Sequence, residues 1–155
     1  MRITHKVDYA VRAMTALARH DAIAPGVPVK REVLADEESI PPAFLDDILR
    51  SLRNGGLASS QRGADGGWKL ARPAKSITVG AIIRTVEGPL AAVRGIRPHD
   101  LVDDGVDEPF VSLWVATRAT LRRVLDVVTI ADLAAGKLPA KVSKLLDDPE
   151  AWETR

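Results

Sequence analysis

The chain has 155 residues, of which 46% are apolar and 28% are charged, a composition that supports one compact domain with added helices. It contains no cysteine, which excludes disulfides, thiol redox switches and cysteine-bound zinc or iron–sulfur centres. The net charge is only +1, but residues 1–75 hold 12 basic and 9 acidic side chains, whereas residues 76–155 hold 10 and 12. Because we find neither a signal peptide nor an apolar run of about 18 residues, we expect a cytoplasmic protein without a membrane span.

The chain begins with a predicted amphipathic helix. Thr4 is a suitable N-cap, and the apolar residues that follow recur with helical spacing to about His20. Residues 22–28 contain two prolines and a glycine, so the helix gives way to a loop there. One apolar stripe on this helix indicates that it packs against a core.

Two further helices follow this loop. A short helix is expected over about residues 30–36, with Val33 and Leu34 facing inward. After a turn, a longer helix begins at the prolines 41–42 and ends at the stop signal of residues 54–56, Asn-Gly-Gly. Two short helices joined by a tight turn, the second one amphipathic, fit a helix-turn-helix.

A β-hairpin is predicted directly after the third helix. Residues 57–62 and 68–73 have strand-like composition and flank the tip 63–67, which contains three glycines. A hairpin in this position is the wing of a winged helix-turn-helix. The expected fold class is therefore mainly α with a small β-hairpin wing, followed by a long C-terminal helix.

The C-terminal half predicts more helices. Thr78 caps a helix over residues 79–87, residues 90–108 form a loop, and Asp107 caps a long helix over about residues 109–128. This long helix is too apolar for a lone surface element, so we expect it to be buried against a second copy of the chain. Its expected interface residues are Leu113, Trp114, Leu121, Val124, Leu125 and Val128.

The chain divides into three regions on this interpretation. Residues 1–75 form the DNA-binding winged domain, residues 76–136 form a helical connector and dimerisation region, and residues 137–155 form a C-terminal tail. Thr129 and Asp132 resemble a capping box for a short helix that stops at Gly136, and the tail has the pattern of one or two amphipathic turns.

The exposed side of the third helix is the candidate for reading DNA. It presents Ala43, Asp46, Asp47 and Arg50, of which an alanine suits a thymine methyl group and an aspartate suits a cytosine amino group. Two carboxylates that face DNA would repel its phosphates, whereas attraction between phosphates and basic side chains dominates DNA affinity. The competing interpretation is that Asp46 and Arg50 pair with each other on a solvated face.

The predicted wing supplies cations beside a glycine-rich tip. Arg62 precedes the tip, and Lys69 and Arg72 follow it on the returning strand. An arginine is attracted into a narrow minor groove, and Gly63 permits the backbone to approach a phosphate closely. The alternative is an ordinary solvated hairpin with the same surface charges. The position of this hairpin directly after a helix-turn-helix is what favours a DNA contact.

The order of these motifs resembles the Rrf2 family of bacterial regulators, which includes the iron–sulfur, nitric-oxide and cysteine-metabolism repressors. The resemblance covers about residues 1–135, and its most specific part is the wing. The stretches that carry it are Met1–Thr4, Asp8–Ala13, Leu49–Leu57, Arg62–Trp68, Val86–Leu90, Leu113–Trp114 and Thr129–Leu133.

This resemblance implies a homodimer with crossed C-terminal helices that binds double-stranded DNA at a palindromic operator. It implies that Arg2 and Thr4 lie near phosphates and that Ser60 lies on the wing surface next to DNA. The complete set of expected DNA contacts is Arg2, Thr4, Lys30, Pro42, Ala43, Phe44, Asp46, Asp47, Arg50, Ser60, Arg62, Gly63 and Lys69.

The chain departs from many members of this family in residues 91–112. They place three cluster-binding cysteines there, and this chain has none, so we expect no cofactor and no metal. We interpret His99, Asp100, Asp103 and Asp104 as a solvated acidic loop.

Two modes of action stay open for a repressor of this kind. The protein either binds its operator tightly by itself, or acts mainly through a protein partner or small-molecule effector with weak DNA affinity of its own. No catalytic motif supports an enzyme.

Overall fold

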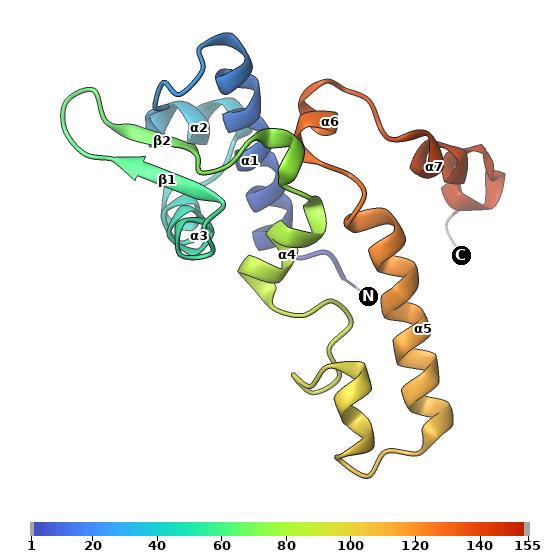
Figure 1. Ribbon diagram of the computed structural model, residues 1–155. Coiled ribbons are helices and arrows are strands. Elements are labelled where there is room, and N and C mark those ends of the chain that lie inside the picture. Colours follow the sequence, from blue (N-terminus) through green and yellow to red (C-terminus); the bar gives the residue numbers. More distant parts are fainter. Residues whose placement is uncertain (1, 154–155) are drawn as a thin grey trace.

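Helix α1 (His5–Ile23) is the centre of the fold and begins as predicted. The Thr4 hydroxyl caps it by accepting a hydrogen bond from the Val7 backbone N–H at 3.2 Å. Figure 1 shows the computed structural model, which describes residues 2–153, with the other elements of the winged domain arranged around α1. Met14 and Leu17 of this helix are almost completely buried in the core.

Helices α2 (Arg31–Glu38) and α3 (Pro42–Asn54) form the predicted helix-turn-helix. Ser39 adopts a left-handed conformation with a φ of 51° and ends α2, after which the chain turns into α3. Leu34 is buried as expected, but Val33 is 38% exposed, so the prediction that Val33 faces inward was wrong. Helix α2 is short, and its buried side consists of Leu34 and Ala35, so Val33 falls outside it.

The predicted hairpin consists of β1 (Ala58–Gln61) and β2 (Gly67–Leu70), paired antiparallel with Ser60 opposite Trp68. Trp68 also exchanges two backbone hydrogen bonds of 2.8 Å with Val29, in the loop before α2. This bridge ties β2, one residue from the tip end of the ladder, to the loop before α2. The tip beyond it extends away from the helices (Figure 1).

Helix α4 (Val79–Glu87) has the predicted bounds, and a 3₁₀ turn at Ala74–Ser76 connects it to the hairpin. Helix α6 (Ile130–Ala134) brings the chain back against α1. Backbone hydrogen bonds join Val79 to Val128 (2.9 Å) and Ile130 to Ile77 (3.0 Å), so the N-termini of both helices are held together. The capping box of Thr129 and Asp132 is confirmed.

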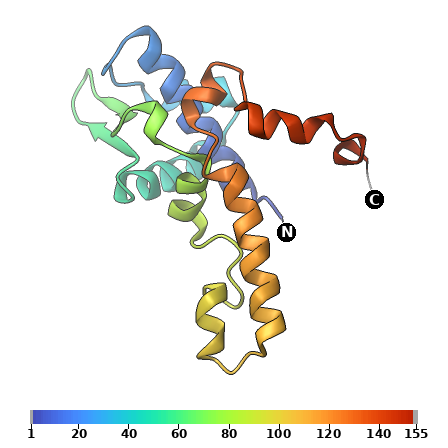
Figure 2. The same cartoon turned by 45° about the vertical axis from the view of Figure 1, so that its right-hand side comes forward.

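Helix α5 (Glu108–Leu125) stands apart from the winged domain, as both views show (Figures 1 and 2). Within this helix only Val111 is buried, and a 3₁₀ helix (Pro98–Val102) packs beside it, in a segment that was expected to be loop throughout. The predicted cap at Asp107 makes no side-chain bond to the helix, and α5 ends at Leu125 rather than at Val128.

The C-terminal segment forms a narrow arm that extends away from the body (Figure 2). It consists of α7 (Ala140–Ser143) and two 3₁₀ helices (Lys144–Asp147 and Pro149–Trp152), which agrees with the expected short amphipathic turns. In the part of the chain that the structure describes, no helix is long and apolar enough to span a membrane.

Candidate nucleic-acid interface

Helix α3 has one buried and one exposed side. Leu45, Ile48, Leu49 and Leu52 are buried in the core. The opposite side exposes the predicted contact residues Pro42, Ala43, Phe44, Asp47 and Arg50. The Phe44 ring is 57% exposed and meets the Tyr9 ring edge-on at 6.3 Å between centroids, so α1 supports an aromatic residue at the start of the recognition helix.

The two acids on α3 each have a basic partner. Asp46 accepts a hydrogen bond of 2.7 Å from Arg31 in α2, and Asp47 accepts one of 3.3 Å from Arg50. The expected alternative pair of Asp46 and Arg50 is not the one that forms. Hydrogen bonds to Glu32 and to Asp46 raise the pKa of Arg31 above its ordinary value. Local pairing therefore reduces the repulsion that these carboxylates would exert on a phosphate.

Arg53 connects α3 to the hairpin. Its guanidinium donates to the Ser60 hydroxyl at 3.4 Å and lies 5.9 Å from the centroid of the Trp68 ring. At the other end of the hairpin, Lys30 donates to the carbonyl of Ala64 in the tip. These contacts place the exposed side of α3 and the wing on one continuous surface.

The wing carries two cations that are not used by the fold. Within residues 2–153, the side chains of Arg62 and Lys69 have no hydrogen-bond or ion-pair partner. Arg62 is exposed and is followed by Gly63, whose φ of +105° suits a residue without a side chain. These side chains are free to contact another molecule.

The expected contacts near the N-terminus differ in their availability. The Thr4 hydroxyl donates to Glu87 at 2.6 Å besides capping α1, so both of its hydrogen-bonding roles are filled inside the chain. Arg2 is exposed beside it. Of this pair, the arginine is the better candidate for a phosphate contact.

The expected interface residues lie mostly on one side of α5. Leu113 is 53% and Trp114 is 37% exposed, and Leu121, Val124 and Leu125 are half-buried. Val128 lies beyond the helix and is already buried within the chain, where its carbonyl accepts from Val79.

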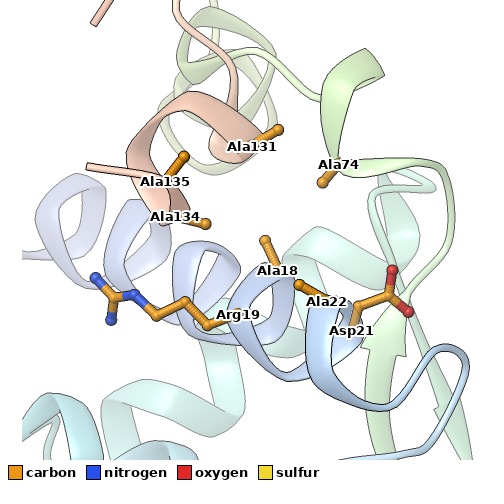
Figure 3. Close-up of a pocket in the computed structure, with 8 residues that line it drawn as sticks. All are labelled: Ala18, Arg19, Asp21, Ala22, Ala74, Ala131, Ala134 and Ala135. Atoms are coloured by element: carbon orange, nitrogen blue, oxygen red, sulfur yellow. The ribbon is translucent and has the colours of Figure 1, made fainter. Parts of the chain in front are cut away.

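A hollow of about 350 Å³ between α1, α6 and the turn before α4 is lined mostly by alanine methyl groups (Figure 3). Arg19 at its edge points away from it and pairs with Glu38 at 2.9 Å. Such walls offer few polar atoms to orient a ligand.

Comparison with known proteins agrees with this architecture. A family model described as Rrf2, an iron-dependent transcriptional regulator, matches residues 3–136. The chain belongs to the Rrf2 family. A Mycobacterium tuberculosis protein, named as an HTH-type transcriptional regulator, is 45% identical over 99% of this chain and 94% of its own length. The resemblance inferred from the motifs is therefore confirmed, and with it the winged-helix fold and a function in transcription regulation through DNA.

Solved structures of Rrf2 proteins have the same fold. The global cysteine regulator CymR of Bacillus subtilis superposes with a TM-score of 0.71 at 30% identity, covering 88% of this chain and 98% of that one. IscR of T. potens superposes with a TM-score of 0.67, also at 30% identity, covering 100% of this chain and 93% of that one. Both likenesses extend past the hairpin into the helices of the C-terminal half.

The iron dependence in the family's description does not fit the side chains of this chain. The sequence offers no thiolate to bind an iron–sulfur cluster. Within residues 2–153 there is no group of three or more histidine, aspartate or glutamate side chains that could hold a metal ion. In the loop, the His99 ring pairs instead with Asp100 at 3.1 Å. This Rrf2 protein lacks the ligands of a cluster-based sensor.

Sequence reasoning did not include Arg31, Arg53 or Trp68 among the site residues. The partners of Arg31 and Arg53 come from other elements, so local spacing gave no signal for these pairs. For Arg53, the one available signal was its place at the margin of the exposed side of α3, next to the hairpin.

Proposed function

We propose that this protein is a sequence-specific repressor that binds a palindromic operator as a homodimer in the cytoplasm. Residues 1–75 would bind DNA, residues 76–136 would connect and dimerise the subunits, and residues 137–155 would form a tail. The observation that carries the proposal is the Arg53 contact with Ser60 and Trp68. This contact joins the exposed side of α3 to the wing. A single DNA duplex can therefore contact α3 and the wing at the same time.

In this proposal the first turns of α3 enter the major groove. Ala43 and Phe44 supply apolar contacts for a thymine methyl group, and Asp47 accepts from a cytosine amino group. The wing then lies along the neighbouring minor groove, where Arg62 inserts and Lys69 approaches a phosphate.

Dimerisation follows from the apolar side of α5. Phe110 and Leu113 are each more than half exposed, and such side chains seldom form a row on a monomer. A second copy that covers this row by two-fold symmetry would present two recognition helices to DNA. A palindromic operator matches that symmetry.

The alternative with weak intrinsic DNA affinity rests on the two carboxylates of α3. Their pairing with Arg31 and Arg50 favours instead a repressor that binds its operator by itself, because each negative charge already has a basic partner in the free protein. The two functions predict different salt behaviour. Direct binding through phosphates weakens steeply with salt, whereas a protein that depends on a partner gains affinity only when that partner is added.

The deciding experiment is selection of DNA fragments by the purified full-length protein, followed by fluorescence anisotropy at several salt concentrations. We expect an inverted repeat to be enriched and to bind roughly a thousandfold more tightly than scrambled DNA. Equal affinity for selected and scrambled fragments at every salt concentration would contradict a sequence-specific repressor. A selected site without two-fold symmetry would contradict the dimeric arrangement.

A further inference from the structure

Three arginines line one pocket between α4 and α5. The pocket has a volume of about 280 Å³ and is formed by the end of α4, the segment after it and the middle of α5. Arg84 comes from α4, Arg97 from the loop and Arg118 from α5. The remaining lining residues are Gly88, Pro89 and Leu90.

The arginines are not neutralised by the pocket itself. Its lining contains no carboxylate. Arg84 donates to Asp126 at 2.7 Å, and Arg118 lies 3.1 Å from the ring nitrogen Nδ1 of His99. Within the described residues, the side chain of Arg97 has no hydrogen-bond or ion-pair partner. Of these three side chains only Arg84 is paired with a carboxylate, and that carboxylate, Asp126, also accepts from Arg122 at 3.0 Å.

This concentration of charge contrasts with its surroundings. Residues 76–155 hold more acidic than basic side chains, yet the pocket collects only basic ones. Several other arginines of the chain pair with carboxylates, as Arg94 does with Asp104 and Arg19 with Glu38. Like charges repel in a partly enclosed space, so an arrangement of this kind is stabilised when an anion enters it.

We propose that this pocket binds a small organic anion with two or more negative charges, in the form of phosphate or carboxylate groups. Guanidinium groups bind both through paired, charge-assisted hydrogen bonds. The volume is at the lower end for ligand sites, which favours a compact metabolite over a nucleotide. Pro89 and Leu90 provide an apolar wall for its carbon skeleton.

The same pocket links the parts that must move together on DNA. Helix α4 packs on α1 and α3, whereas α5 carries the proposed dimer surface. An anion held by Arg84, Arg97 and Arg118 would fix α5 relative to the winged domain, and thereby the spacing of the two recognition helices. This regulatory consequence rests on the proposed function, whereas anion binding itself does not.

Calorimetry on the full-length protein without DNA tests the site. Inorganic phosphate and pyrophosphate form one arm of the experiment, and citrate forms the other. The comparison shows whether the site binds phosphate groups or carboxylate groups. We expect at least one of them to bind, and Arg97→Met and Arg118→Met each to weaken that binding by roughly tenfold. Arg123→Met is the matched control, because Arg123 is exposed on the same helix but does not line the pocket.

Each result decides the proposal. It is overturned if none of the three anions binds, or if Arg97→Met and Arg123→Met bind them alike. A thermal melt checks that Arg97→Met, which alters an exposed loop residue, is folded. If Arg97→Met weakens operator binding more than Arg123→Met in buffer free of these anions, the arginines contact DNA instead and the proposal also fails. If the parent protein binds anions but shows no preference for an operator, the proposed repressor function is contradicted while the anion site is retained.

Discussion

At the scale of single residues, the availability of a cation depends on what it already contacts. Arg31, Arg50 and Arg53 lie in or beside the helix-turn-helix, but each is engaged by another side chain of the fold. Arg62 and Lys69 have no such partner within residues 2–153. Because residues 1–75 have little surplus positive charge, we expect these two side chains, together with the exposed Arg2, to carry a large share of phosphate neutralisation.

The substitution Arg62→Ala should weaken operator binding by about 1–3 kcal/mol without changing stability, because the side chain contacts DNA and not the fold. Anisotropy titrations against operator and scrambled DNA measure the first effect, and urea melts measure the second. Arg123→Ala removes the same charge from the outside of α5 and should bind nearly as the parent does. Equal operator affinity of Arg62→Ala and the parent would remove the wing from the DNA interface.

At the scale of elements, the wing is positioned by close contact between two backbones. The bridge of Val29 to Trp68 brings Gly67 against the chain before α2. A Cβ atom on Gly67 would overlap the backbone carbonyl group of Val29, which cannot move aside as a flexible side chain could. Glycine is required here by proximity, unlike Gly63, where the positive φ is the reason.

Gly67→Ala should destabilise the protein by about 1–3 kcal/mol, since the overlap must be relieved by separating the hairpin from the loop. Operator affinity should fall with it, because the wing loses its fixed position relative to α3. Gly26→Ala is a suitable comparison, because a Cβ atom there would meet no atom within 4 Å, although its φ of +74° adds backbone strain. Chemical denaturation and anisotropy measure the two effects. A Gly67→Ala variant as stable as the parent would show that the bridge does not hold the wing.

The elements that the sequence predicted well are those with strong local signals. Thr78 and Gly88 flank α4, and its bounds were predicted correctly from the cap and the glycine. The end of α5 was not: the helix stops at Leu125, and the Val128 carbonyl beyond it accepts from the Val79 N–H of α4 at 2.9 Å. A contact between residues so far apart in the chain leaves no trace in local periodicity.

The candidate site was predictable to a similar extent. The exposed side of α3 follows from helical periodicity, so Ala43 and Asp47 were identified correctly as exposed. The pairing of Asp46 with Arg31 was not foreseen, because the α2–α3 angle decides which cation reaches that carboxylate. The anion pocket was also missed, since its three arginines belong to three separate segments.

At the scale of the whole molecule, Asp126 joins α4 to α5. Burial alone would raise the pKa of Asp126, but hydrogen bonds from Arg84 and Arg122 outweigh it, and the pKa is lowered. A lowered pKa in the folded state means that the carboxylate stabilises the fold above its ordinary value of about 3.9 and ceases to do so as the pH falls through the lower folded value. Protonation of Asp126 should therefore account for part of the loss of folding stability at low pH.

Asp126→Asn should lower stability at neutral pH, with a difference from the parent that shrinks as the pH falls from about 5 toward 2. Urea melts at several pH values measure this difference. Asp103→Asn, at an exposed position in the loop, should leave the melts nearly unchanged. A difference between Asp126→Asn and the parent that is constant over this pH range would show that the ionised carboxylate is not the stabilising group.

The assembly of the molecule depends on the apolar side of α5. With 3.6 residues per turn, Phe110, Leu113 and Leu121 fall on one side of the helix, while Val111 and Arg118 face the winged domain and its loop. Helix α5 contacts the 3₁₀ helix Pro98–Val102 and α4, and the outer row stays exposed or half-buried within the chain. A second copy crossing there would bury this row without disturbing the core.

Leu113→Asp should therefore weaken a two-fold dimer by roughly tenfold or more, because a carboxylate would be buried in the interface without a partner. Ala119→Asp is the matched control, since residue 119 lies on the side of α5 opposite the row of Phe110 and Leu121 and is already exposed. Light scattering at micromolar concentration gives the assembly state, and anisotropy gives operator affinity, which should fall in parallel because each monomer binds only one half-site. A monomeric parent protein would contradict the dimer itself. A dimeric Leu113→Asp variant with unchanged affinity would place the interface elsewhere on the molecule.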